Sequence, residues 1–299
     1  MDLKISYRIV YIVVVCVLVK YLKYLTVNLY LIFYLLNLSG DVELNPGPTT
    51  GRRQCNIMYC NIRGLHANLK DLTASSRQFD IIFCAETLVS NFRSPSELLI
   101  PNFKNPFLLK RNERERGQGM AAYIRKGYPA SRKACYECPC HEMLVIKLCG
   151  RQSNFYLFSL YRNTDANDSI FDCLLNSMAT IQGNDRKAAF VFMGDFNAHH
   201  REWLNSVSPT DCHGHRALDF ATESGCSQLI QGSTHLSGNP LDLIFTDVPG
   251  VVTCNIGNPI GTSDHDFVRT VIRTEQAVPE ISSSRKIFLK SRADWDRVL

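Results

Sequence analysis

Acidic and amide side chains stand at the ends of several apolar segments that are typical of buried strands. Asn61 ends one such segment, Glu86 follows Ile81–Ala85, and Asp195 follows a third. Because an unpaired carboxylate is unfavourable to bury, acids that converge on one edge of a sheet favour a shared cation. Carboxylate and amide oxygens suit Mg²⁺ or Mn²⁺ better than zinc. The pattern therefore predicts a divalent-metal site.

Further polar residues extend this set. Asp195 and Asn197 lie two residues apart, so an extended backbone would send both side chains to the same side. Asp242 lies within an apolar strand, and Asp264 with His265 follows a glycine-containing loop. An aspartate beside a histidine fixes the tautomer of the imidazole and keeps it protonated near a phosphate. These residue types predict a site for an anionic, phosphate-containing substrate.

The segments that must position these residues alternate between apolar runs and helical patterns. Strands are predicted over Asn56–Asn61, Ile81–Glu86, Ala121–Arg125, Leu144–Leu148, Phe155–Tyr161, Ala188–Met193 and Leu241–Thr246. An amphipathic stretch runs through Leu72, and a helix is predicted over Asp168–Asn184. Strands this apolar must be covered on both faces. The expected fold class is α/β (α+β), a four-layer sandwich of two packed mixed β-sheets flanked by helices.

The ordered series of site residues resembles the endonuclease/exonuclease/phosphatase superfamily, which includes the apurinic endonucleases and the pancreatic-type DNases. Its members are Asn61, Glu86, Tyr161, Asp195, Asn197, Asp242, Asp264 and His265. Three stretches resemble the non-LTR retrotransposon branch in particular: 61–65 (NIRGL), 194–200 (GDFNAHH) followed by Trp203, and 234–242 (THLSGNPLD). The resemblance covers residues 54–274. The polar tail 275–299 is similar to the segment that such polyproteins place before a reverse transcriptase.

The resemblance implies a metal centre. Glu86 would bind Mg²⁺ or Mn²⁺ with help from Asn61, and Asp264 would be a further metal-side or orienting acid. The metal would polarise the scissile phosphate and stabilise the departing 3′ oxygen. Apurinic endonucleases carry an acid two residues after the asparagine, where this chain has Arg63. This departure implies fewer carboxylates at the metal and disfavours specificity for abasic sites.

The resemblance also implies catalytic roles. Asp195 would orient or deprotonate the attacking water, and Asn197 and Tyr161 would hold the phosphate. His265, oriented by Asp242, would neutralise charge on the phosphoryl oxygens. The expected activity is metal-dependent nicking of DNA by the target-site endonuclease of a non-LTR retrotransposon. A full-length copy of such an element would add a reverse transcriptase module as partner.

Basic residues predict contacts with DNA, and the formal net charge of +5 is in line with a polyanionic partner. A cluster surrounds a Gly-Gln-Gly turn: Lys110, Arg111, Arg114, Arg116, Arg125 and Lys126. The alternative is a solvated charged hairpin, helped by Glu113 and Glu115. We assign DNA contacts to Arg63, Arg116 and Arg125.

A second motif precedes this domain. It resembles the 2A-like ribosome-skipping peptides and matches their D-x-E-x-N-P-G-P core at Asp41, Glu43, Asn45, Pro46, Gly47 and Pro48. Proline is a constrained secondary amine and a poor acceptor for peptide transfer, so the ribosome would stall there. No bond would then form between Gly47 and Pro48. The product from Pro48, which begins with a linker over 48–53, would remain in the nucleus or cytoplasm.

The leader, residues 1–47, contains an almost uninterrupted apolar stretch over 9–36 that is long enough to cross a bilayer. Lys20 and Lys23 lie in its middle, and each would cost about 2.5–3.5 kcal/mol at a bilayer centre. A clean span is therefore not expected. Residues 9–19 have the length of a signal-peptide core, so membrane contact or secretory targeting of the leader or the unskipped chain is the alternative.

The twelve cysteines are scattered through a chain much longer than a disulfide-stapled domain, and we interpret most of them as reduced thiols. Cys135, Cys138, Cys140 and His141 are zinc-type ligands within seven residues. Four ligands this close would strain a tetrahedral site, and no second cluster lies at a normal spacing. We expect a cysteine-rich loop before the strand Met143–Cys149, with a metal site as the alternative.

Four further histidines have no assigned chemistry. His199 and His200 lie beside the predicted site and are expected to support or pack against it. His213 and His215 are expected in an exposed loop.

Two other functions fit the same sequence. One is a membrane-associated lipid or inositol phosphodiesterase of the same fold, which the hydrophobic leader would favour. The other is an inactive remnant that only binds nucleic acid. The catalytic residues alone do not separate these functions from the nuclease.

Overall fold

The structure is a computed structural model that describes residues 54–90, 94–109, 119–150, 152–163 and 169–274. All of them belong to one compact unit, Gly51–Leu299, which contains its own hydrophobic cores. The leader with its skipping motif, the linker 48–53, Arg116 and the tail 275–299 lie outside the described residues. Among the helices that are described, none is long and apolar enough to cross a membrane.

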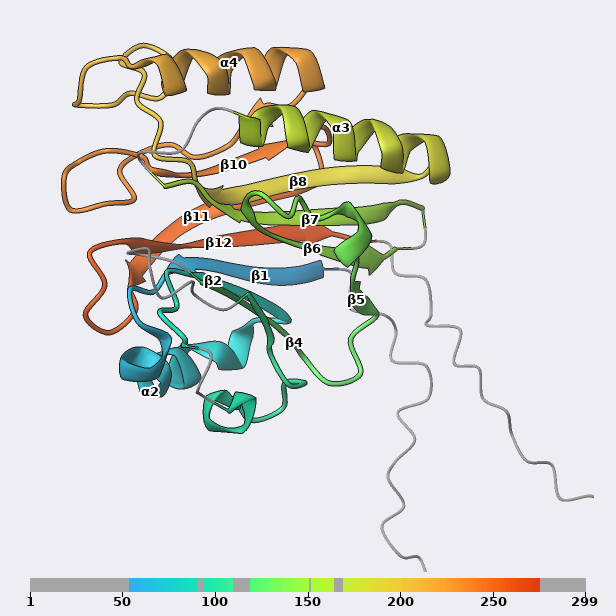
Figure 1. The fold of residues 1–299 in the computed structure, drawn as a ribbon, viewed down its shortest axis with the longest axis vertical. Coiled ribbons are helices and arrows are strands. Elements are labelled where there is room, and N and C mark those ends of the chain that lie inside the picture. Colours follow the sequence, from blue (N-terminus) through green and yellow to red (C-terminus); the bar gives the residue numbers. More distant parts are fainter. Residues whose placement is uncertain (1–53, 91–93, 110–118, 151, 164–168, 275–299) are drawn as a thin grey trace, which may run out of the picture. The chain divides into compact units, whose positions relative to one another are not determined.

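Two six-stranded mixed β-sheets pack face to face (Figure 1). The first has the order β11-β12-β1-β2-β4-β3 and consists of β1 (Gln54–Asn61), β2 (Ile81–Ala85), β3 (Phe107–Leu109), β4 (Met120–Ile124), β11 (Val252–Pro259) and β12 (Asp266–Arg273). The second has the order β5-β6-β7-β8-β10-β9 and consists of β5 (Ala130–Arg132), β6 (Glu142–Cys149), β7 (Asn154–Tyr161), β8 (Ala188–Asp195), β9 (Ser227–Gln228) and β10 (Asp242–Thr246).

Helices cover the outer faces of both sheets (Figure 1). The first sheet carries α2 (Leu65–Ser75), and the second carries α3 (Ser169–Asn184) and α4 (Cys212–Ser224). Three short 3₁₀ helices complete the described elements: η1 (Ser76–Gln78), η2 (Pro95–Leu98) and η3 (Ala134–Tyr136). The predicted four-layer sandwich is confirmed.

Three hydrophobic cores separate the four layers, and strand alternation explains how each is filled. In β1, Ile57 and Tyr59 join the core between the sheets, while Met58 and Cys60 join the core under α2. Phe192 of β8 likewise packs in the core beneath α3 and α4. Because both faces of these strands are buried, their sequences are continuously apolar.

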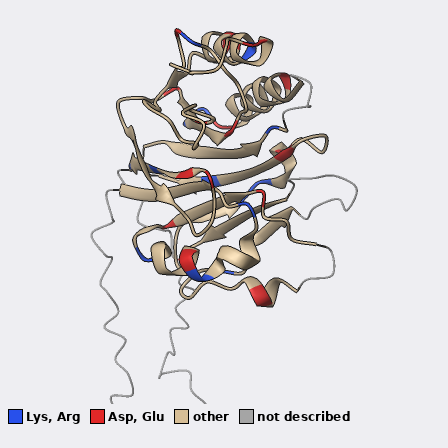
Figure 2. Cartoon of the chain, turned by 90° about the vertical axis from the view of Figure 1, so that its left-hand side faces the viewer, with Lys and Arg blue, Asp and Glu red and all other residues tan. Residues whose placement is uncertain are grey.

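Parallel pairing gathers the polar strand ends on one side of the molecule. β1 is parallel to β2, and β7 is parallel to β8, so the carboxyl ends of these four strands point the same way. β10 and β12 run antiparallel to β8 and β1, so their first residues lie at the same ends. Figure 2 faces this side of the molecule. We call it the catalytic edge.

The expectation that His213 and His215 lie in a loop is wrong, because both residues are in the first turns of α4. Asp211 caps this helix, and its side chain accepts a hydrogen bond from Gly214 N at 2.6 Å. Gly214 also packs directly on the carbonyl of His199, where a Cβ would not fit. This close approach explains why the helix contains a glycine. From the sequence alone, the same glycine suggested that the segment is a loop.

Candidate active site

A row of three side chains crosses the catalytic edge of the second sheet. Asp195, the last residue of β8, lies opposite Tyr161 of β7 on one side and opposite Asp242 of β10 on the other. Asp195 is 2% exposed and Asp242 is 1% exposed. Two carboxylates buried this close need a positive partner.

His265 provides that partner from the loop before β12. Its Nδ1 lies 2.8 Å from Asp242 Oδ2, and its Nε2 faces Asp195 Oδ2 at 3.9 Å. Ser263 fixes this loop, because its hydroxyl donates to Asn61 O at 2.6 Å and accepts from His265 N at 3.1 Å. The predicted Asp242–His265 pair is therefore present as a buried hydrogen-bonded unit.

Asn61, at the end of β1, joins the two sheets. Its Nδ2 lies within donor distance of Glu86 Oε1 at 2.9 Å and of Asp195 Oδ2 at 3.0 Å. His265 Nε2 is 3.4 Å from the same nitrogen. One amide thus touches the metal-side acid, the general-base candidate and the imidazole that the sequence assigned to a single site.

Backbone strain is concentrated beside Asn61. Arg63 has φ +46° and Glu86 has φ +47°, both in the left-handed region that non-glycine residues rarely adopt. Arg63, whose side chain is 52% exposed, pairs with Asp264 and lies 3.8 Å from Glu86. Such strain often marks sites where a side chain must be aimed in one direction. Here it turns Glu86 toward Asn61 immediately after β2 ends.

The oxygen atoms at this position fit a divalent metal. Within the described part of the chain, Asn61 Oδ1 and Asp264 Oδ1 are buried and have no hydrogen-bond partner. The Glu86 carboxylate lies beside them through its contacts with Asn61 and Arg63. Buried acceptors without donors are uncommon unless a cation or water satisfies them. An all-oxygen donor set of this type suits Mg²⁺ or Mn²⁺.

Burial and mutual charge shift the pKa values of two catalytic candidates. Desolvation, strengthened by the negative charge of Asp242, raises the pKa of Asp195 to about 8. Burial alone would lower the pKa of His265, but the hydrogen bond and charge of Asp242, with the charges of Asp195 and Asp264, raise it to about 9. At neutral pH the imidazole is therefore protonated, as a group that neutralises phosphate charge must be.

The His265 pKa gives a direct test of its pairing. Replacing Asp242 by asparagine removes the largest contribution that raises this pKa, so the value should fall from about 9 toward the ordinary 6.5. An NMR titration of the histidine rings in metal-free protein measures the change. Asp264→Asn is the matched control and should lower the pKa less. An unchanged value in Asp242→Asn would show that the pair does not hold the proton.

Two tyrosines lie beside Asp195, one in each sheet. Burial, with the negative charges of Glu86 and Asp195, raises the pKa of Tyr161, so its hydroxyl stays protonated and can donate. Tyr59, which the sequence analysis missed, accepts a hydrogen bond from Asp195 N at 2.8 Å and donates to Leu160 O at 3.3 Å. It thereby fixes the end of β8 against β1. Its position two residues before Asn61, on the same strand face, was the available signal.

Asn197 reaches the site by a different route from the one predicted. Its φ of +46° rules out an extended Asp195–Asn197 segment, so that expectation is wrong. Its backbone N donates to Asp195 Oδ1 at 3.1 Å, and its side-chain Nδ2 donates to Arg162 O at 2.7 Å. Arg162 in turn donates to Phe196 O at 2.8 Å and Asn197 O at 3.1 Å. This buried arginine holds the loop after β8, and its role was also missed.

A further histidine contacts the site, and two others follow Asn197 in the sequence. His235 was not singled out, yet its Nε2 lies 3.3 Å from Asp264 Oδ2 and its ring packs against that of His265 at 4.6 Å. His199 pairs with Asp211 at 3.0 Å, and His200 is buried with its Nδ1 accepting from Trp203 N at 3.1 Å. These contacts join the last two residues to Asp211 and Trp203, so their support of the site stays a prediction.

Arg125, assigned to DNA, lies away from the catalytic edge. Its Nε donates to Phe79 O at 3.0 Å and pairs with Asp80 at 3.5 Å, and its guanidinium covers the Phe103 ring. Asp80 precedes β2, whereas Glu86 follows it, so the two mark opposite ends of the same strand. The described contacts of Arg125 are internal to the fold, and its contact with DNA stays a prediction.

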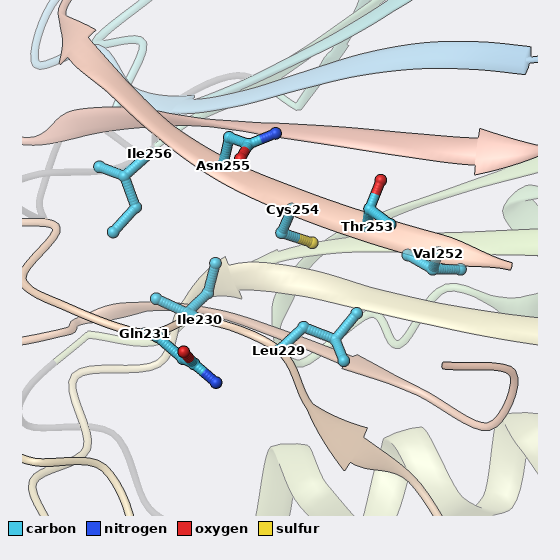
Figure 3. A pocket seen from close by; sticks show the side chains of 8 residues that line it. All are labelled: Leu229, Ile230, Gln231, Val252, Thr253, Cys254, Asn255 and Ile256. Carbon is cyan, nitrogen blue, oxygen red and sulfur yellow. The ribbon is translucent and has the colours of Figure 1, made fainter. Parts of the chain in front are cut away.

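A cavity of about 480 Å³ lies elsewhere, between β11 and the segment after β9 (Figure 3). Its lining is mostly apolar and includes Leu229, Ile230 and Ile256. It contains none of the residues of the catalytic edge.

Comparisons with known proteins agree with this geometry. The family described as endonuclease-reverse transcriptase matches residues 155–269, a stretch that includes Tyr161, Asp195, Asp242 and His265. The endonuclease domain of TRAS1, a telomere-specific non-LTR retrotransposon, is similar with a TM-score of 0.56 and 17% identity, covering 75% of this chain and 100% of that domain. The search of curated proteins found no match.

Two AP endonucleases are similar in the same way. The enzyme from Leishmania major has a TM-score of 0.60 and 13% identity, covering 74% of this chain and 88% of its own. The enzyme from Archaeoglobus fulgidus has a TM-score of 0.55 and 15% identity, covering 73% of this chain and 99% of its own. Residues 54–274 therefore have the fold of the endonuclease/exonuclease/phosphatase superfamily.

Proposed function

We propose that this chain is a divalent-metal-dependent phosphodiester hydrolase that nicks DNA, the target-site endonuclease of a non-LTR retrotransposon. The observation that carries the proposal is the contact of Asn61 with both Glu86 and Asp195, which joins a metal-side acid and a general base across the two sheets. Similarity to the TRAS1 endonuclease domain supports DNA as the substrate.

The residues divide the chemistry between them. Glu86, Asn61 and Asp264 would hold the metal, which when bound polarises the phosphate and stabilises the leaving oxygen. Asp195 orients the attacking water and, in its ionised form, accepts the proton of that water. The Nε2 proton of His265 points toward the Asp195 carboxylate, where the attacking water would lie.

His265 and Tyr161 act on the phosphate itself. The imidazolium, held by Asp242, neutralises charge that grows on the phosphoryl oxygens. The protonated Tyr161 donates a hydrogen bond to the phosphate from the neighbouring strand. A rate enhancement for phosphodiester hydrolysis requires a barrier reduction of about 20 kcal/mol, more than any one group supplies. The proposal therefore depends on the whole set acting together.

Substrate class is tested on one purified protein, residues 48–299, with Mg²⁺. Supercoiled plasmid is compared with sphingomyelin vesicles and inositol phosphates. We expect open circles that DNA ligase reseals, because cleavage of the bond between phosphorus and the 3′ oxygen leaves a 3′ hydroxyl and a 5′ phosphate. Hydrolysis of lipid or inositol phosphates with intact plasmid would instead support the lipid phosphodiesterase. Plasmid binding without nicking under Mg²⁺ or Mn²⁺ would support the inert remnant.

We also propose that the 2A-like segment, Asp41–Pro48, separates the leader from the nuclease during translation. The segment lies outside the described residues, so the support comes from its sequence, which matches the skipping core in full. The product from Pro48 would then act in the nucleus or cytoplasm, where its DNA and the reverse transcriptase of the element are found.

Translation of the chain in a eukaryotic cell-free extract should give two products that divide between Gly47 and Pro48. Asn45→Ala should give one full-length product, because it breaks the motif that stalls the ribosome. Gel separation of labelled products measures the ratio, and Asn37→Ala, eight residues upstream, is the matched control. A single product from the parent sequence would contradict skipping.

A further inference from the structure

The turn before β6 docks on one face of α3. Ser169, Cys173 and Ser177 are spaced four residues apart, so their side chains share that face of the helix. Ser177 Oγ donates to Tyr136 O at 3.0 Å, and Ser169 Oγ lies 2.9 Å from His141 Nε2. The loop is thereby aligned along the first three turns of the helix.

Soft donor atoms meet at the centre of this contact. One ligand atom each from Cys138, His141 and Cys173 lie within 4.8 Å of one another, and all three residues are half-buried. The turn makes this meeting possible, because His141 N donates to Cys138 O at 3.3 Å and returns both side chains toward α3. None of these residues belongs to the catalytic edge.

The two sulfurs of the cluster are close to each other but are not bonded. Cys138 Sγ and Cys173 Sγ are 2.9 Å apart, well beyond the roughly 2.05 Å of a disulfide. Two thiolates at about 2.3 Å from a tetrahedral zinc lie roughly 3.8 Å apart, so a small side-chain rotation would admit the metal. Two thiolates and an imidazole are donors that zinc prefers over magnesium.

We propose that Cys138, His141 and Cys173 bind a structural Zn²⁺ that ties the turn before β6 to the first turns of α3. Cys140, an exposed thiol two residues after Cys138, is near enough in sequence to provide the fourth ligand that a closed structural site requires. The ion holds the start of β6, where Glu142 lies opposite Tyr161. It therefore supports the catalytic edge from outside without taking part in the reaction.

Metal content and cobalt spectroscopy test this site. The purified full-length chain should contain one zinc per chain, and exchange with Co²⁺ should give the near-ultraviolet absorption of a thiolate–cobalt bond. Cys173→Ser and His141→Ala should each lose most of the zinc. Cys149→Ser, a matched change at an exposed cysteine outside the cluster, should keep both signals. Glu86→Gln should also keep the cobalt band, because the catalytic edge offers oxygen ligands.

The parent chain gives the decisive result, which does not depend on whether a variant folds. A reduced, folded parent chain that takes up neither zinc nor cobalt into thiolate coordination would overturn the proposal. So would a Cys138–Cys173 disulfide found by non-reducing peptide mapping, or full zinc content in Cys173→Ser.

Discussion

Asp195→Asn should lower the rate of DNA nicking by about 10²–10⁴-fold, because the amide has the shape of the carboxylate but does not accept the proton of the attacking water. Asp195 lies at the end of β8 within hydrogen-bond distance of Asn61, so the substitution leaves the packing in place. Single-turnover nicking of a supercoiled plasmid at saturating Mg²⁺ measures the loss.

The same variant should be at least as stable as the parent. The pKa of Asp195 is raised to about 8 from the ordinary 3.8, so between these pH values the folded protein must hold a proton that the unfolded chain releases. Such a group destabilises the fold as pH rises from 3.8 through 8. Asparagine removes this penalty, and the Tm of metal-free Asp195→Asn at pH 7.5 should equal or exceed that of the parent.

Asp247→Asn is the matched control. This half-buried carboxylate follows β10, at the end of the sheet opposite the catalytic edge, and accepts from Phe190 N at 2.7 Å. It should nick DNA at the parental rate. A parallel loss of activity and Tm in Asp195→Asn would assign Asp195 a structural role and contradict its role as the base.

Glu86→Gln should change the metal dependence of nicking. The substitution removes the formal negative charge from the acid that Asn61 and Arg63 contact, beside the buried Asn61 and Asp264 oxygens that lack donors. Charge stabilisation by a metal is worth several kcal/mol. At about 1 mM Mg²⁺ the nicking rate of Glu86→Gln should therefore fall by about 10³-fold. The Mg²⁺ concentration that gives half-maximal rate should rise.

A titration of nicking rate against Mg²⁺ separates these two effects. Glu97→Gln, which removes an equal charge from the cap of η2, should leave the titration unchanged. If Glu86→Gln and the parent require the same Mg²⁺ concentration, Glu86 is not a metal ligand. The oxygens of Asn61 and Asp264 would then need another explanation.

Much of this site is visible in the sequence, for a definite physical reason. Asn61, Glu86, Tyr161 and Asp195 each stand at the carboxyl end of an apolar strand, and parallel pairing brings such ends to one edge. Continuous apolar runs also indicated that both faces of the strands are covered. The expectation of four layers followed from that pattern.

Other features depend on backbone conformation or on pairing that composition does not reveal. The left-handed φ of Asn197 is fixed by Arg162, which lies 35 residues away in sequence. β11 and β12 were not predicted, because polar residues interrupt their apolar positions. Arg125 looked like part of a basic surface, yet its charge meets Asp80 inside the fold.

The cluster of Cys138, His141 and Cys173 also depends on a contact between segments that are distant in sequence. Cys135, Cys138, Cys140 and His141 are too close in sequence to surround one ion without strain, so a cysteine-rich loop was the expectation. The structure keeps that loop but adds Cys173, 35 residues further on, from the face of α3. A helix face supplies the separation that the turn alone lacks.

The central claim is that one constellation at the catalytic edge nicks DNA. The most direct measurement is conversion of supercoiled plasmid to open circles by residues 48–299 with Mg²⁺, beside Asp195→Asn and His265→Ala. We predict that the parent chain converts the plasmid and that the nicking rate of each variant is lower by about 10²-fold or more. No conversion by folded parent protein, or equal conversion by all three, would contradict the account.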